Sequence, residues 1–529
     1  MKRKELLDRL DLHCFIAFDF ETTGLDIYHD RIIELAAVKF EHGEITDRFV
    51  TLVNPEIHIP NLITDITGIT DAMVLDKPVE KMIVDDFLRF LGNHPIVAHN
   101  IHFDIGFLKS LCERSERIMG KNTLYDTLQL SRNLLFDQPV FNLGALSEYY
   151  GLSSDNTHRA ESDTINTGRI FLELLDELSK YPLDVISKIN SMVKGKDIPN
   201  RKLFTDIGNE LIKKGDMGEG ISSFEREMVF KSNIFSCIGN NSISDITSKE
   251  VFGDDGLLSK IHPNFEYRYN QEKYAEKVSE LLNSDKRVGV IEAGTGLGKS
   301  MSYLFGAIKR SEEFETNGPT IIACHTKHLQ DQLFYKDLPV LSKALDVPLK
   351  AVMLKGRKNY LCCTRMNWLI SDSNTLETAE IEALLPIIFW MYWTKTGDIS
   401  ECSGFFNTRR NWLKSLICSD TGFCTTEICK NNDGCFYGKL KKSIFHAQLI
   451  VVNHSLLMTN LVQKGLLPEY ESVIIDEAHN IVKSAYDQFK VEWSEQKVSY
   501  QLQALDPSFP RSSRWNNILL SLNKINNDA

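Results

Sequence analysis

The sequence predicts an α/β protein with two successive α/β domains. Strand-like and helix-like patterns alternate from the start of the chain to about residue 180, and a second alternating pattern begins near residue 265 and runs past 480. Within the second pattern, a glycine-rich turn is followed by a helical run, which is typical of a phosphate-binding loop. The length of 529 residues leaves room for three or four domains.

The expected elements follow one another in a regular order. Residues 14–24 and 32–55 are expected to form strands and a hairpin, 79–92 a helix, and 95–100 a short buried strand. In the second domain, the apolar run before the glycine turn, 287–292, is expected to be a strand. The run VIIDEAHN at 473–480 has the form of a second strand that ends in two carboxylates.

These patterns divide the chain into four segments. Residues 1–180 form the first domain and 181–262 a helical segment with a linker, because 231–262 is rich in Ser, Asn, Asp and Gly. Residues 263–485 form the second domain, in which 355–445 is an insertion. Residues 486–529 belong to a further insertion.

The composition excludes several classes of protein. At 43% hydrophobic and 25% charged residues the chain is ordinary globular material, and no apolar run reaches the roughly 18 residues of a membrane span. The charged start, MKRKELLDRL, is not a secretory signal, so we expect a cytoplasmic protein without a membrane partner. A net charge of -12 argues against coating nucleic acid by bulk charge but permits a local basic channel.

A set of acidic residues and one histidine in the first domain indicates a metal site. Asp19 and Glu21 are two apart on an expected strand, so their carboxylates share one face. Asp104 follows a strand, and His158 and Asp163 are five apart at the start of an expected helix. Adjacent carboxylates repel unless a cation lies between them, and hard cations prefer carboxylate oxygens.

This set resembles the DnaQ-like 3′-5′ exonucleases whose last motif begins with histidine. The family pattern is Asp-x-Glu, then Asn-x-x-x-Asp, then His-x-x-x-x-Asp, and the chain has it in order, with Asn100 preceding Asp104. The resemblance implies an RNase H-like fold and two Mg²⁺ or Mn²⁺ ions. It implies that Asp19 bridges both ions, that Glu21, Asp104 and Asp163 complete their shells, and that His158 accepts a proton from the attacking water.

The glycine turn of the second domain has the residues of a phosphate loop. Backbone amides of such a loop wrap phosphates, the lysine reaches the β and γ phosphates, and the serine hydroxyl binds Mg²⁺. The first position holds alanine in place of glycine, a departure shared with superfamily-two helicases, which the region resembles. The loop residues are Ala293, Gly294, Thr295, Gly296, Leu297, Gly298, Lys299 and Ser300.

Two further motifs extend this resemblance. In the run IIDEAH, Asp476 would complete the Mg²⁺ shell of ATP and Glu477 would orient the hydrolytic water. Upstream, Arg268 and Gln271 in YRYNQ resemble the adenine-side motif of these helicases. The second domain is therefore expected to be a P-loop, RecA-like domain that binds ATP with Mg²⁺.

Spaced cysteines in the insertion indicate a second kind of metal centre. Cys362, Cys424, Cys429 and Cys435 would supply four thiolates, which suit zinc or an iron–sulfur cluster, and spacing alone does not decide between them. The surrounding motifs resemble the XPD/DinG family of iron–sulfur helicases, which favours a [4Fe–4S] cluster.

Other cysteines of this region leave the ligand set open. Cys363 and Cys418 are alternatives for the fourth ligand, and Cys402 is expected to be structural.

The insertion also has the composition of a single-strand contact surface. Twelve Lys and Arg stand against nine Asp and Glu between 355 and 445, and four of the six tryptophans lie there: Trp368, Trp390, Trp393 and Trp412. Basic side chains track phosphates and aromatic faces stack on unpaired bases. For the run IIFWMYW itself, the core of a helical insertion is the better explanation.

Together these motifs resemble a DinG-type architecture, in which a DnaQ-like exonuclease domain precedes an iron–sulfur helicase. The resemblance implies a metal-dependent 3′-5′ exonuclease on single-stranded DNA, with RNA left open, and a role in DNA repair or replication. It also implies that 486–529 begin the arch insertion and that a C-terminal RecA-like lobe is lacking, so unwinding would need a separate chain. The alternative is an ATP-binding, iron–sulfur nucleic-acid-binding module.

Overall fold

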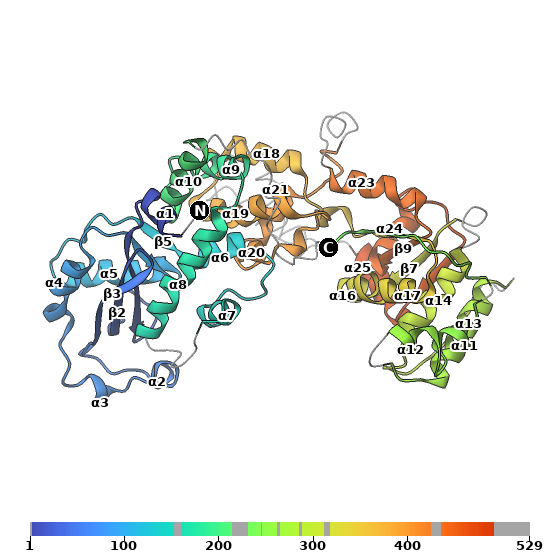
Figure 1. The fold of residues 1–529 in the computed structure, drawn as a ribbon, viewed down its shortest axis with the longest axis horizontal. Coiled ribbons are helices and arrows are strands. Elements are labelled where there is room, and N and C mark those ends of the chain that lie inside the picture. Colours follow the sequence, from blue (N-terminus) through green and yellow to red (C-terminus); the bar gives the residue numbers. More distant parts are fainter. Residues whose placement is uncertain are drawn as a thin grey trace, which may run out of the picture. The chain divides into compact units, whose positions relative to one another are not determined.

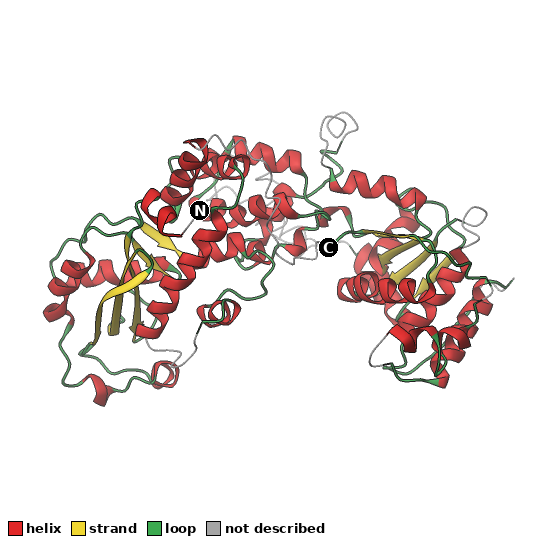
Figure 2. Cartoon of the chain, in the orientation of Figure 1, coloured by secondary structure: helices red, strands yellow, loops and turns green. Residues whose placement is uncertain are grey.

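The computed structural model describes residues 3–152, 160–213, 231–244, 246–261, 265–284, 288–311, 318–424 and 435–490 (Figure 1). The chain divides into two compact units. The first contains residues 1–233 and 356–441, and the second contains residues 234–355 and 442–529. Helices surround a sheet in each unit, as the predicted α/β class requires (Figure 2).

The first unit contains a 5-stranded sheet in the order β3-β2-β1-β4-β5. Strands β1, β2 and β3 pair antiparallel, whereas β1, β4 and β5 pair parallel, which is the mixed sheet of the predicted RNase H-like fold. The central strand β1 is almost wholly buried, because Phe15, Ala17 and Phe18 pack into the two layers beside the sheet. The strands are β1 (Cys14–Thr22), β2 (Ile32–Glu41), β3 (Glu44–Leu52), β4 (Ile96–Ala98) and β5 (Leu124–Asp126).

The helices of residues 3–213 all belong to this unit. Their amphipathic faces cover the sheet or pack on one another. They are α1 (Arg3–Arg9), α2 (Asn61–Thr67), α3 (Asp71–Val74), α4 (Glu80–Leu91), α5 (Ile101–Arg114), α6 (Thr127–Leu134), α7 (Leu143–Tyr149), α8 (Ala160–Leu178), α9 (Leu183–Val193) and α10 (Arg201–Lys213).

The cysteine-bearing insertion is part of the first unit, which the sequence analysis did not foresee. Its helices are α18 (Cys363–Ser371), α19 (Thr378–Trp393), α20 (Ser403–Phe406), α21 (Lys414–Ile417) and, at its end, α23 (Phe436–Ser443). One continuous hydrophobic core runs from α6, α8, α9 and α10 into α18, α19 and α20. The insertion and the first domain are therefore expected to fold together.

Close polar contacts join the insertion to this core. The indole Nε1–H of Trp393 donates to the Tyr181 hydroxyl at 3.0 Å, and the amide of Gly404 donates to the Phe136 carbonyl at 3.1 Å. A Cβ at Gly404 would lie 2.1 Å from the carbonyl oxygen of Arg132, so only glycine allows this approach. The run IIFWMYW is core, as expected, since Trp390 is 2% exposed.

The second unit contains a 5-stranded sheet in the order β10-β7-β9-β8-β6. All its pairs are parallel except the one between β6 and β8. The strands are β6 (Ile234–Cys237), β7 (Thr320–Cys324), β8 (Leu349–Met353), β9 (Leu449–Asn453) and β10 (Ser472–Ile475). The α-helices are α11 (Ser248–Phe252), α12 (Leu257–Ile261), α13 (Tyr269–Leu282), α14 (Lys299–Arg310), α16 (Lys327–Gln332), α17 (Leu338–Leu345), α24 (His454–Val462) and α25 (Ile481–Phe489), with a π-helix between α16 and α17 (Leu333–Asp337).

Two expectations about this unit were wrong. Residues 234–261 are not a linker, because β6 joins the sheet and Val251, Phe252 and Leu258 enter the core; the polar residues that suggested a linker lie between these buried positions. The run 287–292 contains no described strand, and Val288 and Val290 are 81% and 92% exposed. An apolar run forms a strand only where a neighbouring strand offers it hydrogen bonds. Among the described strands, the edge strand β10 pairs with β7 alone, so the run does not extend the sheet beside β10.

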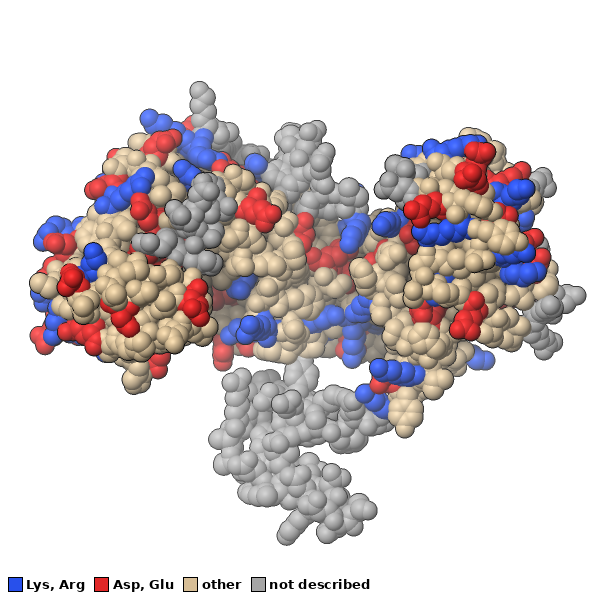
Figure 3. Space-filling model, turned by 90° about the horizontal axis from the view of Figure 1, so that it is seen from below, with Lys and Arg blue, Asp and Glu red and all other residues tan. Residues whose placement is uncertain are grey.

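No helix of the described residues is both long enough and apolar enough to cross a membrane. Basic and acidic side chains are interspersed on the face shown in Figure 3, without a large area of one sign. Contacts with a polyanion would therefore have to come from local features of the surface.

Candidate functional site

Three predicted metal ligands come together beside the second half of the central strand β1. Asp19 and Glu21 lie on the same face of β1, and Asp163 lies in the first turn of α8. Carboxylate oxygens of the three residues lie within 4.8 Å of one another. A strand and a helix that are far apart in sequence thus converge on one group of hard oxygen ligands, which fits the chemistry of Mg²⁺ or Mn²⁺.

Asp104 lies beside this group without belonging to it. It is in the first turn of α5 and 1% exposed, and its Oδ1 accepts a hydrogen bond from the amide of Phe20 at 3.2 Å. Phe20 is the residue between Asp19 and Glu21, so the bond fixes α5 against the metal-binding part of β1. Burial, and then the charge of Asp19, raise the pKa of Asp104 well above its usual value.

The start of α5 depends on the predicted Asn100. This residue has φ 71°, a left-handed conformation that asparagine tolerates better than most residues. Its backbone N–H donates to Oδ1 of Asp126 at 3.1 Å. The turn directs the first residues of the helix, Asp104 among them, toward β1.

The predicted general base, His158, lies outside the described residues. The helix that follows it, α8, begins at Ala160, whose amide donates to Oε2 of Glu34 at 3.1 Å. Glu34 is on β2, directly opposite Glu21, and is 2% exposed. Sequence analysis missed Glu34, although a carboxylate inside the apolar run IIELAAV was a signal that could have identified it.

Electrostatic strain in the acidic group has a direct cause. Burial raises the pKa of Asp19 to about 7, and the charges of Asp163 and Glu34 add to the shift. A cation among these oxygens would relieve the strain, because it favours the ionised form.

This strain predicts a pH dependence in the metal-free protein. The folded form keeps a proton on Asp19 that the unfolded chain, with a pKa of 3.8, releases. Stability from this group is therefore full below pH 3.8 and is lost as the pH rises toward 7. Saturating Mn²⁺ should abolish this loss, because binding displaces the proton. Thermal unfolding across this range with and without Mn²⁺ checks it, and identical pH profiles would contradict it.

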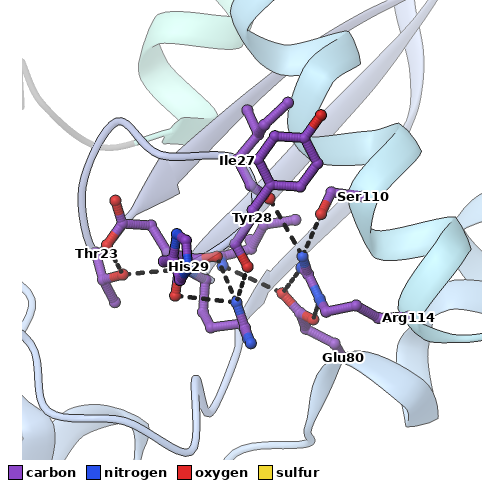
Figure 4. A network of polar contacts seen from close by, with 10 residues as sticks. Thr23, Ile27, Tyr28, His29, Glu80, Ser110 and Arg114 are labelled. Atoms are coloured by element: carbon purple, nitrogen blue, oxygen red, sulfur yellow. Dashed lines mark hydrogen bonds and ion pairs between the residues drawn. The ribbon is translucent and has the colours of Figure 1, made fainter.

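A network of polar contacts centred on Arg114 reaches the loop after β1 (Figure 4). The Arg114 guanidinium donates two hydrogen bonds to Glu80, at 2.9 and 2.8 Å, and one to the Ser110 hydroxyl at 2.5 Å. A longer bond of 3.5 Å reaches the carbonyl of Ile27, within the loop. The ion pair is mostly shielded from water, so it joins α4 to α5 more strongly than a surface pair would.

The second unit brings its predicted phosphate-loop residues to the end of β10. Ala293 to Gly298 form the turn before α14, and Gly296 and Gly298 have φ of 79° and 85°, which glycine adopts without strain. The Lys299 ammonium group donates a hydrogen bond to Glu477 at 2.9 Å, and the Tyr303 hydroxyl donates to Asp476 at 3.1 Å.

The predicted adenine-side residues contact the same turn. The Gln271 amide donates to the carbonyl of Gly298 at 3.2 Å, and Arg268 donates to that of Gly296. Ser300 is the second residue of α14, about one turn before Tyr303, with which it shares a hydrogen bond. All the residues predicted for ATP therefore gather in one part of the second unit. A phosphate bound in this loop would compete with Glu477 for the ammonium group of Lys299.

The predicted cysteine centre is described in part. Cys362 precedes α18, and burial, followed by the nearby thiols of Cys424 and Cys435, raises its pKa. Cys429 lies outside the described residues. Burial, and then the thiols of Cys362 and Cys435, raise the pKa of Cys363. The charged groups that affect the pKa of Cys418 are instead Arg365, Asp420 and two lysines. Cys363 is therefore the better placed of the two alternatives for the fourth ligand. The described thiols are not drawn together as closely as the carboxylates of the acidic group.

Cys402 was expected to be structural, and it is fully buried in the shared core of the first unit. Its burial raises the pKa of the thiol far above its usual value, as expected of an inert cysteine.

Comparison with protein families assigns both regions. Residues 16–171 match the family described as Exonuclease, and residues 324–498 match DEAD_2. A match to the res subunit of type III restriction enzymes covers residues 264–378. The chain combines an exonuclease domain with a helicase domain. The acidic group lies within the exonuclease match, whereas Asp476 and Glu477 lie within the DEAD_2 match.

Curated relatives align with most of the chain. The chain is 30% identical over 484 residues to the 3′-5′ exonuclease DinG of Bacillus subtilis strain 168, which covers 89% of the chain and 50% of that protein. It is 25% identical over 496 residues to the 3′-5′ exonuclease DinG of Staphylococcus aureus strain MRSA252, covering 92% and 52%. The chain spans about half the length of these relatives.

Solved structures similar to the chain are nucleases. Exonuclease X in complex with 5′ overhanging duplex DNA is 27% identical, with a TM-score of 0.25, and covers 31% of this chain and 90% of that one. The nuclease domain of 3′hExo, a DEDDh family member bound to rAMP, is 22% identical, with a TM-score of 0.28, and covers 31% and 92%.

Proposed function

We propose that the exonuclease domain removes nucleotides from the 3′ end of single-stranded nucleic acid, with DNA as the substrate and two Mg²⁺ or Mn²⁺ ions as cofactors. The observation that carries this proposal is the convergence of Asp19, Glu21 and Asp163 within 4.8 Å. The match of residues 16–171 to the Exonuclease family and the similarity to 3′-5′ exonuclease DinG proteins support it.

Each residue of the site has a defined task in this proposal. Divalent ions would lower the pKa of the attacking water and stabilise the leaving oxygen. Asp19, Glu21 and Asp163 hold the ions, and Asp104, bonded to the backbone of β1, completes the set when its proton is displaced. His158 accepts the proton of the attacking water. Glu34 fixes the start of α8, the helix that follows His158 in the sequence.

The experiment that tests this proposal uses a single strand labelled at its 5′ end. Purified protein with Mn²⁺ should shorten the strand one nucleotide at a time and release 5′-mononucleotides. With Mg²⁺ in place of Mn²⁺, a strand whose last 3′ linkage is a phosphorothioate should resist, because sulfur is a poor ligand for this hard cation. Release of the 5′ label as a mononucleotide before shortened strands accumulate, or equal hydrolysis without a divalent ion, would refute the proposal.

A second function is favoured by the geometry of the other unit. We propose that residues 293–300, with Arg268, Gln271, Asp476 and Glu477, bind ATP with Mg²⁺, since Lys299 and the two carboxylates already meet there. We further propose a [4Fe–4S] cluster on Cys362, Cys424, Cys429 and Cys435, which would act with the helicase domain in DNA repair or replication in the cytoplasm. Unwinding would require a second lobe that contacts the nucleotide, on this or a separate chain.

Replacement of Lys299 by alanine tests ATP binding. Loss of the ammonium group should weaken binding of a fluorescent ATP analogue by more than about tenfold, since one charge-assisted contact to phosphate contributes about 1.5–3 kcal/mol. Lys343→Ala, an exposed position of α17, is the control and should bind as wild type does. Nuclease activity should be unchanged in both variants. Equal affinity for the analogue in wild type and Lys299→Ala would contradict the assignment.

A further inference from the structure

The first unit contains a large groove that no predicted site uses. Its volume is about 1260 Å³, larger than the roughly 300–1,000 Å³ of small-molecule pockets. The outer face of α5, the residues before β5, and helices α9 and α10 line it. Helices α9 and α10 lie between the two main family matches, in a part of the chain to which no family match assigns a role.

The charge of the groove opposes that of the whole chain. Asp197 is its one acidic residue among the described lining, against several basic ones, while the chain has a net charge of -12. Lys109, Lys121 and Lys194 are exposed and make no ion pair with any described residue. The basic lining comprises Lys109, Lys121, Lys194, Arg201 and Lys202, with His102 at one end.

The remaining lining suits a nucleic acid strand better than a compact anion. Two exposed polar side chains, the Ser187 hydroxyl and the Asn209 amide, lie among the basic residues of the lining. Such groups donate to phosphate and sugar oxygens along a strand, and several separated cations match a row of phosphates.

Helix α5 lies between the groove and the acidic site and contributes residues to both. Residues two apart on a helix point to nearly opposite faces, because each residue turns the chain by about 100°. Asp104 therefore faces β1, whereas His102 and Lys109 face the groove. His102 also lies 3.6 Å from Glu382 of α19, which joins this end of the groove to the insertion.

We propose that this groove binds the sugar–phosphate backbone of the single strand on the 5′ side of the nucleotide held at the acidic site. The proposal rests on the proposed exonuclease function and adds a substrate-holding surface to it. The strand would pass around the N-terminus of α5. It would run from the acidic site on one side of the helix to Lys109 on the other. The groove would hold the substrate between successive cleavages.

A charge-reversal pair tests binding directly. The variant Lys109→Glu/Lys194→Glu is compared with Lys4→Glu/Lys81→Glu, which makes the same change in net charge at exposed positions outside the groove. Anisotropy of a labelled twenty-nucleotide oligothymidylate is measured without divalent ions at several salt concentrations. The groove variant should bind about tenfold more weakly, and its salt slope should fall by about 1.4 for two lost contacts. The control should match wild type.

Two substrates separate this proposal from the proposed function. The groove variant should show a raised KM for the long strand and an unchanged rate with the p-nitrophenyl ester of thymidine 5′-monophosphate, which reaches only the acidic site. Wild-type protein that hydrolyses neither substrate would refute the exonuclease function. Equal strand affinity and salt slope in the groove and control variants would overturn the groove proposal, and this is also the result expected if the groove accepts an acidic protein segment instead.

Discussion

Replacement of Asp19 by asparagine is expected to abolish nucleotide release, with a loss of at least about 10³-fold in kcat. The substitution keeps the size of the side chain and removes the charge that two cations would share. Charge stabilisation of several kcal/mol is at stake, and each 1.36 kcal/mol is a factor of ten in rate. The measurement is release of mononucleotides from a single strand at saturating Mn²⁺.

The stability of this variant separates chemistry from folding. Burial, and then the charges of Asp163 and Glu34, raise the pKa of Asp19, so a neutral side chain at this position should leave the metal-free protein at least as stable as wild type at neutral pH. Asp65→Asn, at an exposed position of α2, is the matched control and should retain full activity. Activity of Asp19→Asn within about tenfold of wild type would contradict the role of Asp19 as a shared ligand.

Replacement of Trp390 by alanine is expected to destabilise the exonuclease domain, although Trp390 belongs to the insertion. The side chain is 2% exposed in the core that joins α19 to α6 and α9, and loss of a buried tryptophan costs about 3–5 kcal/mol. The temperature at which nuclease activity is lost should fall, together with the midpoint of urea unfolding. Both quantities are measured on the full chain.

The same substitution elsewhere in the insertion provides the control. Trp412 is 46% exposed, so Trp412→Ala should change the unfolding free energy little. If the insertion were independent of the exonuclease domain, Trp390→Ala would leave the thermal inactivation of nuclease activity unchanged. That outcome would contradict the shared core.

The sequence predicted the site better than it predicted the domains. Spacing of two on a strand was enough to place Asp19 and Glu21 on one face, and the family pattern identified Asp163, which the fold brings to them. Glu34 was missed because it belongs to no spaced motif; its one signal is the position of a carboxylate inside an apolar run.

The domain organisation depended on contacts that local patterns do not encode. The apolar face of α19 reveals that it is buried but not that its partners, α6 and α9, lie far away in the sequence. The composition of 231–262 predicts a linker because the few residues there that are buried are separated by polar ones. The run 287–292 was taken for a strand because a pattern shows preference for a sheet but not the availability of a neighbour.

The most direct test of the central claim is to count Mn²⁺ ions at the acidic site. Electron paramagnetic resonance of the protein with Mn²⁺ and thymidine 5′-monophosphate should show a spin-coupled pair of ions, and the pair should be absent in Asp19→Asn. A signal from isolated, uncoupled Mn²⁺ in a wild-type sample that is fully active would contradict the claim that Asp19, Glu21 and Asp163 hold two ions for hydrolysis.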